Sequence, residues 1–332
     1  MNQLLQPGYE PTYGLITEPV TTINYQDYMY RHPLGKKLSH WRRKLAFKQF
    51  QFYGVSSKEW ILGCAIADLK YLAAAFYYRY HLPTQSYYHY SCKQPFNYRA
   101  RTSVMPDQGE WYLMHGKNSF IMNTHNQTRN LEIRLTNGEY VNLCLSEHNT
   151  DPLRLCTRTG INGWTYTQKN TALIVNGELS CSLGKFNLDQ TLGQYDWSAG
   201  FMRRETFWNW ASLNGRSHEH GLFGLNVSAG VNETSFSENC YWINGKRHPL
   251  TRINFIYSRQ NILAPWDIYT EDRCLDLQFT PLGKHHERVN AILLASNFQQ
   301  LFGHFSGSLT LADDSVLPID EVGIVEEHYA KW

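Results

Sequence analysis

The sequence lacks the short motifs that mark the common cofactor-dependent and nucleophilic enzymes. Its 332 residues contain no GxGxxG, P-loop, GxSxG or HExxH pattern. Dinucleotide binding, phosphate binding by a glycine-rich loop, a serine nucleophile elbow and a zincin-type metal centre therefore have no signature. The histidines at 218, 220, 285 and 286 stand in Gly-, Ser- or Lys-containing stretches, which favours exposed loops over metal ligands. We expect neither a metal nor a cofactor.

The charge and cysteine patterns argue against further classes. The net charge is only +2 and no long basic block occurs, so nucleic-acid binding has no electrostatic footprint. The seven cysteines include no CxxC pair, which favours reduced thiols in a cytoplasmic protein. The first residues have neither a basic start nor an apolar core, so we expect no signal peptide. Asp68, Lys70 and Arg79 interrupt the apolar stretch 60–80, which argues against a membrane span.

Hairpin signals dominate the chain after residue 50, where long helical periodicity is absent. Asn-Gly occurs five times, at 137, 162, 176, 214 and 244. This dipeptide between strand-like runs is a strong hairpin signal, because a type I′ turn needs positive φ at both central positions. Only residues 36–48 place apolar side chains on one helical face. Many strands joined by tight turns predict antiparallel sheets closed into barrels or sandwiches.

The strand pattern repeats weakly, which predicts two related β domains. A strand, an Asn-Gly hairpin, an Asp-Trp or Trp-Asp pair and a further strand occur around 160–210 and again around 223–280. The chain before residue 46 is extended and marked by prolines. We therefore predict an N-terminal arm with a short helix at 1–45, a first β domain at 46–190 and a second β domain at 191–332.

Several stretches, taken in order along the chain, carry a resemblance to a known family. They lie at 52–55, 63–69, 164–169, 196–197, 208–210, 237–239, 265–266 and 300–303. Over nearly the whole chain this order resembles the bacterial domain-of-unknown-function family twenty-eight hundred and four. That family is similar to the tandem lipocalin-like superfamily, which includes carotenoid hydratases and tocopherol cyclase.

The resemblance implies a fold and a general kind of chemistry. The fold it implies is all-β, with two tandem antiparallel lipocalin-like (calycin) barrels and few short helices. Enzymes of that superfamily work with acid–base groups in a hydrophobic ligand cavity, without a metal or a nucleotide. The family itself implies no particular reaction, so candidate residues must be sought from their local patterns.

Two aspartates and a lysine form the predicted catalytic set. Asp68 lies between apolar strands, and burial raises the pKa of a carboxyl group, as a general acid requires. The alternative for Asp68 is a strand-end side chain that binds nearby backbone. Asp196 is expected to begin the strand that carries the Arg and Trp residues, and Lys169 is its expected partner. Because an ammonium group keeps a neighbouring carboxylate ionised, Asp196 would serve as a base or as an orienting group. The alternative for Lys169 is a solvated strand residue.

An aromatic ligand wall is predicted in the region 195–245, which holds four of the ten tryptophans interleaved with charges. By the two-residue alternation of a strand, Arg204, Trp208 and Trp210 share one face. Together with Trp197 they could stack against a ligand or bind its acidic group. The alternative is an inter-strand salt bridge over a tryptophan core.

Polar residues that follow the small-residue strand 223–231 are predicted to orient the ligand. These are Asn232, Glu238 and Asn239, with an edge-loop cap as the alternative. We expect a hydrophobic small-molecule ligand of lipid or isoprenoid type, which the protein hydrates, isomerises or cyclises by proton transfer. Such a ligand also allows a loose association with membranes or lipid. A non-catalytic lipid carrier and a carbohydrate-active enzyme with paired carboxylates are the alternative functions.

Overall fold

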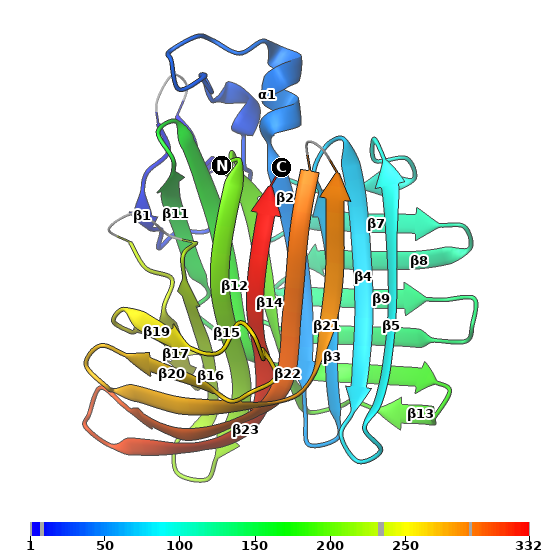
Figure 1. Cartoon of the computed structure of the whole chain (residues 1–332), viewed down its shortest axis with the longest axis vertical. Helices are drawn as coiled ribbons and strands as arrows, with labels where there is room; N and C mark the ends of the chain where they lie inside the picture. Colours follow the sequence, from blue (N-terminus) through cyan, green and yellow to red (C-terminus); the bar gives the residue numbers. More distant parts are fainter. Residues whose placement is uncertain (1, 7–9, 232–235, 292–293, 332) are drawn as a thin grey trace.

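Almost the whole chain forms antiparallel strands. The computed structural model describes residues 2–6, 10–231, 236–291 and 294–331. Within them the helical elements are a 3-10 turn, η1 (Tyr25–Asp27), and one short helix, α1 (His40–Ala46). No helix in these ranges is long and apolar enough to cross a membrane. The strands form two sheets, each curled on itself, so the predicted all-β fold of two tandem lipocalin-like barrels is confirmed (Figure 1).

The first sheet contains fourteen strands of the described chain. Their bounds are β1 (Gly14–Leu15), β2 (Lys48–Ser56), β3 (Trp60–Asp68), β4 (Leu72–His81), β5 (Ser86–Pro95), β6 (Ala100–Arg101), β7 (Gly109–His115), β8 (Asn118–His125), β9 (Thr128–Arg134), β10 (Tyr140–Ser146), β11 (Leu153–Thr159), β12 (Gly163–Cys181), β13 (Gly184–Asn187) and β14 (Thr191–Gly200). The main path runs β5-β4-β3-β2-β14-β12-β10-β9-β8-β7-β6. In Figure 1, β7, β8 and β9 cross behind β2, β3 and β4, which shows the curl of this sheet.

The second sheet contains nine strands of the described chain. Their bounds are β15 (Glu205–Ser217), β16 (Gly221–Ala229), β17 (Cys240–Ile243), β18 (Lys246–Pro249), β19 (Ile253–Ile256), β20 (Trp266–Thr270), β21 (Leu275–Ala291), β22 (Leu294–Thr310) and β23 (Val316–Lys331). Their order is β18-β17-β16-β15-β23-β22-β21-β20-β19. The upper parts of the long strands β21, β22 and β23 run beside the first barrel in Figure 1.

The passage from one sheet to the other falls later than the sequence pattern predicts. Strand β14 pairs with β2 over Leu192–Gly200 and also pairs with β12, so it belongs to the first sheet. The second sheet begins only at Glu205. The predicted division between residues 190 and 191 thus lies immediately before β14, a strand that is hydrogen-bonded into the first sheet. The weak repeat assigned the Asp-Trp pair at 196–197 to the second half, whereas hydrogen bonding places it in the first.

The faces of the central strands explain their nearly continuous hydrophobic sequences. In β2, Tyr53 and Val55 face the core inside the first barrel, whereas Phe52 belongs to a separate cluster between the two barrels. In β15, Leu213 faces the core of the second barrel and Trp210 the cluster between the barrels. Since these strands are covered on both faces, they lack the polar alternation of a one-sided sheet.

A β-bulge in β12 joins the two barrels. The register of β12 against β14 shifts between Asn170 and Leu173, and Ala172 has a φ of 55°. The freed backbone N–H of Ala172 donates to the side-chain oxygen of Asn214 in β15, at 2.6 Å. Gly224 in β16 packs closely against the bulge, since a Cβ atom there would lie 2.0 Å from the Thr171 hydroxyl oxygen. The bulge thus exposes one donor of the first barrel, and the second barrel satisfies it.

We expect Asn214→Leu to destabilise the protein through this joint. The buried Asn214 amide also donates to Gln194 Oε1 at 2.9 Å and to Ser56 Oγ at 3.2 Å. Leucine has the same branched arrangement of side-chain heavy atoms but would leave the Ala172 N–H without its partner, at a cost of about 1–3 kcal/mol. Urea unfolding measures the loss, and Asn142→Leu on an exposed strand position is the matched control. Equal unfolding free energies of the two variants would contradict the proposed joint.

Candidate functional site

A cavity of about 240 Å³ lies between the two barrels and not inside either of them. Strands β2, β3, β4, β12 and β14 provide one wall, and β15, β21, β22 and β23 provide the other. The lining is mainly apolar, and its larger apolar side chains are Phe50, Phe52, Leu69, Leu72, Phe76, Met202, Trp208, Trp210, Val289, Leu294 and Phe298. Polar side chains enter this lining at a few positions on each wall.

On the first wall, one buried lysine holds two carboxylates from different barrels. Lys169 in β12 lies directly opposite Asp196 in β14. The Lys169 Nζ atom is 3.0 Å from Asp196 Oδ2 and 2.8 Å from Glu238 Oε1, and Glu238 precedes β17 of the second barrel. The other Asp196 oxygen accepts hydrogen bonds from Ser198 at 2.8 Å and Thr167 at 3.3 Å. Three of the residues predicted from sequence, at 169, 196 and 238, therefore meet.

The cluster contains two carboxyl groups and one ammonium group. Burial and these charges shift the pKa values of Lys169 and Asp196. Burial lowers the pKa of Lys169, but the attraction of Asp196 and Glu238 outweighs burial and raises it above the ordinary value. Burial raises the pKa of Asp196, and Glu238 adds to the rise, while Lys169 opposes it only in part. The expectation that Lys169 keeps the pKa of Asp196 low is therefore wrong, because burial and Glu238 outweigh the lysine, and the role of Asp196 in catalysis stays a prediction. A single ammonium shared between two carboxylates leaves Asp196 suited to donate a proton.

Trp210 lies beside this cluster and links it to the second barrel. The Lys169 Nζ atom is 5.3 Å from the centre of the Trp210 ring, within cation–π distance. The Trp210 Nε1 atom donates to Asn226 at 2.7 Å, and the Asn226 amide donates to the Glu238 carbonyl at 2.9 Å. The tryptophan therefore has a fixed orientation, with its ring face toward the ammonium group.

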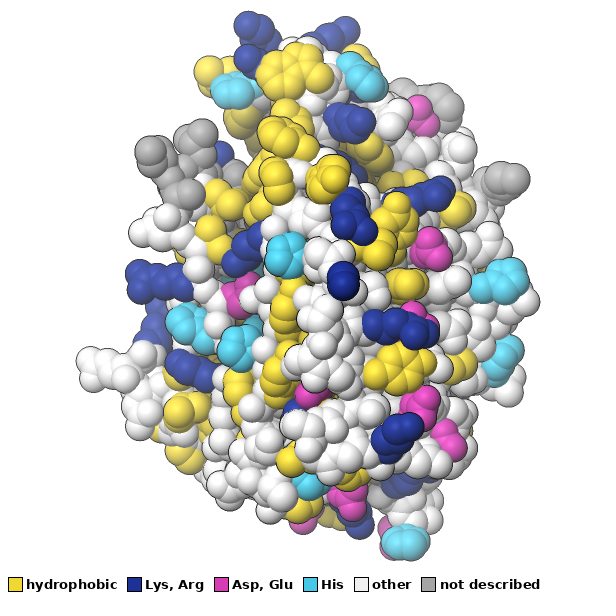
Figure 2. Space-filling view, turned by 90° about the vertical axis from the view of Figure 1, so that its right-hand side faces the viewer, with side chains coloured by type: hydrophobic (Ala, Val, Ile, Leu, Met, Phe, Trp, Pro, Cys, Tyr) yellow, Lys and Arg dark blue, Asp and Glu magenta, His cyan; other side chains and the backbone are white. Residues whose placement is uncertain are grey.

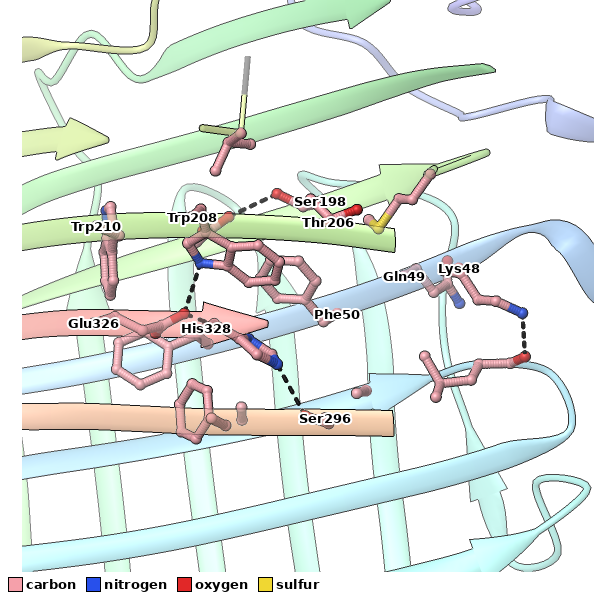
Figure 3. Close-up of a pocket in the computed structure, with 18 of the residues that line it drawn as sticks. Lys48, Gln49, Phe50, Ser198, Thr206, Trp208, Trp210, Ser296, Glu326 and His328 are labelled. Carbon is pink, nitrogen blue, oxygen red and sulfur yellow. Dashed lines mark hydrogen bonds and ion pairs between the residues drawn. The ribbon is translucent and has the colours of Figure 1, made fainter. Parts of the chain in front are cut away.

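The opposite wall carries a further carboxylate, Glu326 in β23. Its Oε1 atom accepts a hydrogen bond from Trp208 Nε1 at 2.7 Å, and its Oε2 atom accepts one from the Gln300 amide at 3.0 Å. Gln300 is in turn held by the Tyr78 hydroxyl of the first barrel, which donates to it at 2.6 Å. Figure 3 shows Trp208, Trp210 and Glu326 together at one end of the cavity.

His328 lies two residues further along β23 and completes this second cluster. Its Nδ1 atom is 3.7 Å from Glu326 Oε1, and its Nε2 atom is 3.0 Å from Ser296 Oγ in β22 (Figure 3). The imidazole packs against Trp208, with ring centres 4.3 Å apart. A carboxylate beside Nδ1 favours the tautomer with a proton on Nδ1, so that Nε2 faces the Ser296 hydroxyl as an acceptor. His328 can therefore act as a base.

None of the residues of this second cluster was predicted from the sequence. Glu326, His328, Ser296 and Gln300 lie on two neighbouring strands. Their spacings are two residues on β23 and four on β22, and even spacings place side chains on one face of a strand. That spacing was readable from the sequence. What could not be read was which face of strands β22 and β23 meets the first barrel.

Lys48 lies at the opposite end of the cavity lining from Trp210 (Figure 3). Its Nζ atom donates to the backbone carbonyls of Leu45 at 2.6 Å and Leu69 at 3.0 Å. Burial lowers the pKa of Lys48 to about 7, although the negative charge of Asp68 opposes this. Its ammonium group therefore connects the end of α1 to the β3–β4 turn.

Asp68 does not have the environment that a general acid needs. It is absent from the cavity lining, and it accepts hydrogen bonds from Lys70 at 2.6 Å, Thr102 at 2.7 Å and Asn97 at 2.8 Å. Burial raises the pKa of Asp68, but Lys70 and these donors together lower it below the ordinary value. The predicted raised pKa is wrong, because the strand-end position supplies donors that an apolar strand alone would lack.

The other predicted ligand residues lie in different places. Trp208 and Trp210 line the cavity, as the alternation predicts, but Trp197 packs on the opposite face of its strand against Trp111 in the first core. Arg204 is exposed and outside the lining, because it precedes β15 and the strand alternation does not reach it. Asn239 is likewise outside the lining. Its amide binds backbone, accepting from Ser228 N at 2.7 Å and donating to Thr251 O at 3.2 Å. Asn232 lies outside the described residues.

The histidine positions also differ in part from expectation. His285 is a buried residue of β21, hydrogen-bonded to the Tyr87 hydroxyl at 2.9 Å, and is not in an exposed loop. Its neighbour His286 is exposed. Among the residues that the structure describes, no three His, Cys, Asp or Glu side chains are arranged to hold a metal ion.

The fold and the cavity define a tandem lipocalin-like protein with ionisable groups between its barrels. The chain belongs to the family described as domain of unknown function DUF2804, whose model matches residues 4–332. No curated protein matches the chain in sequence.

Solved structures show the same fold at low sequence identity. Kievitone hydratase from Nectria haematococca is 12% identical, with 86% of this chain and 89% of that chain covered and a TM-score of 0.51. CghA, in a structure with Sch210972, is 7% identical, with 95% and 94% covered and a TM-score of 0.60. At these identities the similarity concerns the fold alone.

We expect Lys169→Met to destabilise the protein by about 3–5 kcal/mol at neutral pH, because it leaves Asp196 and Glu238 buried together without a cation. The folded-state pKa of Lys169 is raised, so the lysine stabilises the fold fully below its ordinary pKa of 10.5 and loses this effect only above it. The difference in unfolding free energy between the variant and the wild type should become smaller as pH falls toward about 4, where carboxyl groups take up protons.

Chemical unfolding of the variant and the wild type across this pH range measures the effect. Lys185→Met, at an exposed position of β13, is the control and should behave as the wild type does. A loss for Lys169→Met that does not change with pH would show that the two carboxylates are not its cause.

Trp208 and Trp210 should differ when each is replaced by alanine. The deeply buried Trp210 contacts Phe52 of the first barrel, so Trp210→Ala should lower the unfolding free energy by about 3–5 kcal/mol. The half-buried Trp208 faces the cavity, so Trp208→Ala should weaken binding of an apolar fluorescent probe, anilinonaphthalene sulfonate, by about 1–3 kcal/mol. Unchanged probe affinity with a large stability loss would remove Trp208 from the ligand wall.

Proposed function

We propose that this protein binds a hydrophobic small molecule of lipid or isoprenoid type between its two barrels and hydrates, isomerises or cyclises it by acid–base catalysis. The observation that carries the proposal is the buried Asp196 carboxyl group, which faces an apolar cavity and shares one lysine with Glu238. A carboxyl group with a raised pKa in such surroundings can give a proton to a carbon–carbon double bond or a carbonyl oxygen.

The two walls support different roles. Asp196, assisted by Lys169, is the proposed acid on the first barrel. His328, oriented by Glu326, is the proposed base on the second barrel, where it would take a proton from the ligand or from a water molecule that adds to it. Apolar side chains between the walls would keep bulk water from the reacting atoms. Trp208 and Trp210 would hold the flat or extended part of the ligand.

Ser296 is a less suitable nucleophile than its contact with His328 suggests. Strand β22 is paired on one side with β21 and on the other with β23, and both ladders include Ser296. The backbone N–H groups around this serine are therefore engaged in the sheet and are not free to form an oxyanion hole. The arrangement supports proton transfer better than acyl transfer.

The names of the structural neighbours agree with this kind of chemistry. One is a hydratase that is named for kievitone, and CghA was solved with the small molecule Sch210972. A non-catalytic carrier is the alternative function. It is less well supported, because simple storage of an apolar ligand gains nothing from ionisable groups that are costly to bury.

The proposal is tested by incubating the protein with a total lipid extract in heavy water and identifying bound and released molecules by mass spectrometry. We expect one lipid of the extract to be released with the mass of one added water, or with deuterium at carbon. Asp196→Asn and His328→Phe should each lower turnover at least tenfold while the lipid stays bound. His304→Phe, at an exposed position of β22, is the matched control. Lipid that binds and returns unchanged from the wild type would identify a carrier and contradict catalysis.

A further inference from the structure

The end of the molecule that carries α1 combines exposed apolar and basic side chains. Four large apolar residues are exposed here, namely Leu34 (89%), Trp41 (59%), Phe96 (78%) and Tyr98 (69%). They come from the loop before α1, from α1 itself and from the β5–β6 turn, which lie at the same end of the molecule in Figure 1. Single exposed apolar residues are ordinary, but four at one end of a molecule call for a partner.

The same segments carry positive charge with no acid among them. Residues 28–57 contain seven Lys and Arg residues and no Asp or Glu, and residues 69–106 contain five and again no Asp or Glu. The exposed members near the apolar residues are Lys36, Lys37, Arg42, Lys44, Arg99 and Arg101. Hydrophobic side chains lie among Lys and Arg side chains in the upper part of Figure 2. The protein as a whole has a net charge of only +2, so this basic character is local.

This mouth surface, formed by the exposed residues of segments 31–44 and 96–101, is connected to the cavity. Lys48 and Leu69 line the cavity, and the Lys48 ammonium binds the carbonyls of Leu45 at the end of α1 and of Leu69. The Phe96 N–H donates to the Tyr71 carbonyl at 2.9 Å, and Tyr71 precedes the cavity-lining Leu72. The apolar and basic residues thus lie around one end of the cavity.

We propose that the mouth surface docks on an anionic membrane, so that the cavity receives its apolar ligand directly from the bilayer. The chemistry of the surface matches the partner. Trp and Tyr favour the boundary between lipid headgroups and acyl chains, and exposed Lys and Arg are attracted to anionic headgroups. Exposed Trp41 and Phe96 beside Lys36 and Lys37 fit a bilayer, which presents anionic headgroups above apolar chains. This inference rests on the proposed function only for the identity of what enters the cavity.

The surface is tested by co-sedimentation of the whole protein with phosphatidylcholine vesicles, with and without phosphatidylglycerol. We expect binding to the anionic vesicles, with weakening as salt rises, and little binding to phosphatidylcholine alone. Lys36→Glu combined with Lys37→Glu should weaken binding at least tenfold. Trp41→Ala combined with Phe96→Ala should weaken binding to the anionic vesicles at least as much. The binding that remains in this variant should be more sensitive to salt. Lys185→Glu combined with Lys246→Glu changes the charge equally at exposed positions elsewhere and is the control.

Failure of this inference is distinguishable from failure of the proposed function. Equal binding to both vesicle types, no binding to either, or an equal loss for the control pair would overturn membrane docking. None of these outcomes involves turnover. If docking is correct, the lysine and aromatic variants should turn over lipid extract in detergent as fast as the wild type does. Their turnover should be at least tenfold slower only when the lipid is presented in vesicles. Circular dichroism and thermal unfolding verify that each variant is folded.

Discussion

The buried ammonium group of Lys169 is the interaction on which the site depends. It is contacted by Asp196 of its own sheet and by Glu238 of the other barrel, at 3.0 and 2.8 Å. A buried cation requires compensation, and here the compensation comes from both halves of the molecule. The arrangement therefore holds the two barrels in register at the cavity. Burial, together with the negative charge of Glu238, outweighs the lysine and raises the pKa of the Asp196 carboxyl group above its ordinary value.

The cavity exists because the barrels use their outer faces as well as their interiors. Each sheet has its own core, and a third apolar cluster, which includes Phe52, Tyr78, Trp210 and Phe302, fills part of the space between them. Beyond this cluster the facing walls of the two barrels are separated, and the space between them is the cavity. Asp196 on one wall and His328 on the other are thereby presented to the same space. The proposed acid and base come from different domains, so the chemistry can exist only in the packed two-barrel protein.

The joint at the β12 bulge shows how such packing is made specific. Nonspecific apolar contact between two curled sheets would allow them to slide. The Ala172 N–H and Asn214 pair, the close approach of Gly224 to Thr171 and the Tyr78–Gln300 hydrogen bond each allow only one relative position. Both ionisable clusters lie near this joint, since Lys169 precedes the bulge in β12 and Glu326 is paired with Trp210, four residues before Asn214 in β15. The same contacts that fix the interface therefore also fix the distance between the proposed acid and base.

Local features of the sequence were sufficient for the fold class. The repeated Asn-Gly turns, the alternation around Trp208 and Trp210 and the absence of helical periodicity act over a few residues, so an all-β chain of many hairpins could be predicted. The resemblance to a family of tandem lipocalin-like proteins added the number of barrels. The pairing of Lys169 with Asp196 was also predictable, since both lie in stretches that the resemblance identified.

Long-range packing determined the remainder. The sequence could not show that β14 stays in the first sheet, that Trp197 turns to the interior while Asp196 faces the cavity, or that Lys70, Thr102 and Asn97 surround Asp68. Each of these depends on partners distant in the chain or on which face of a strand another barrel covers. The pKa of a carboxyl group depends on those partners, so the assignment of the proposed acid passed from Asp68 to Asp196 only with the tertiary structure. The same reason hid His328, because a histidine two residues from a glutamate becomes a base only when the opposite barrel closes a cavity over it.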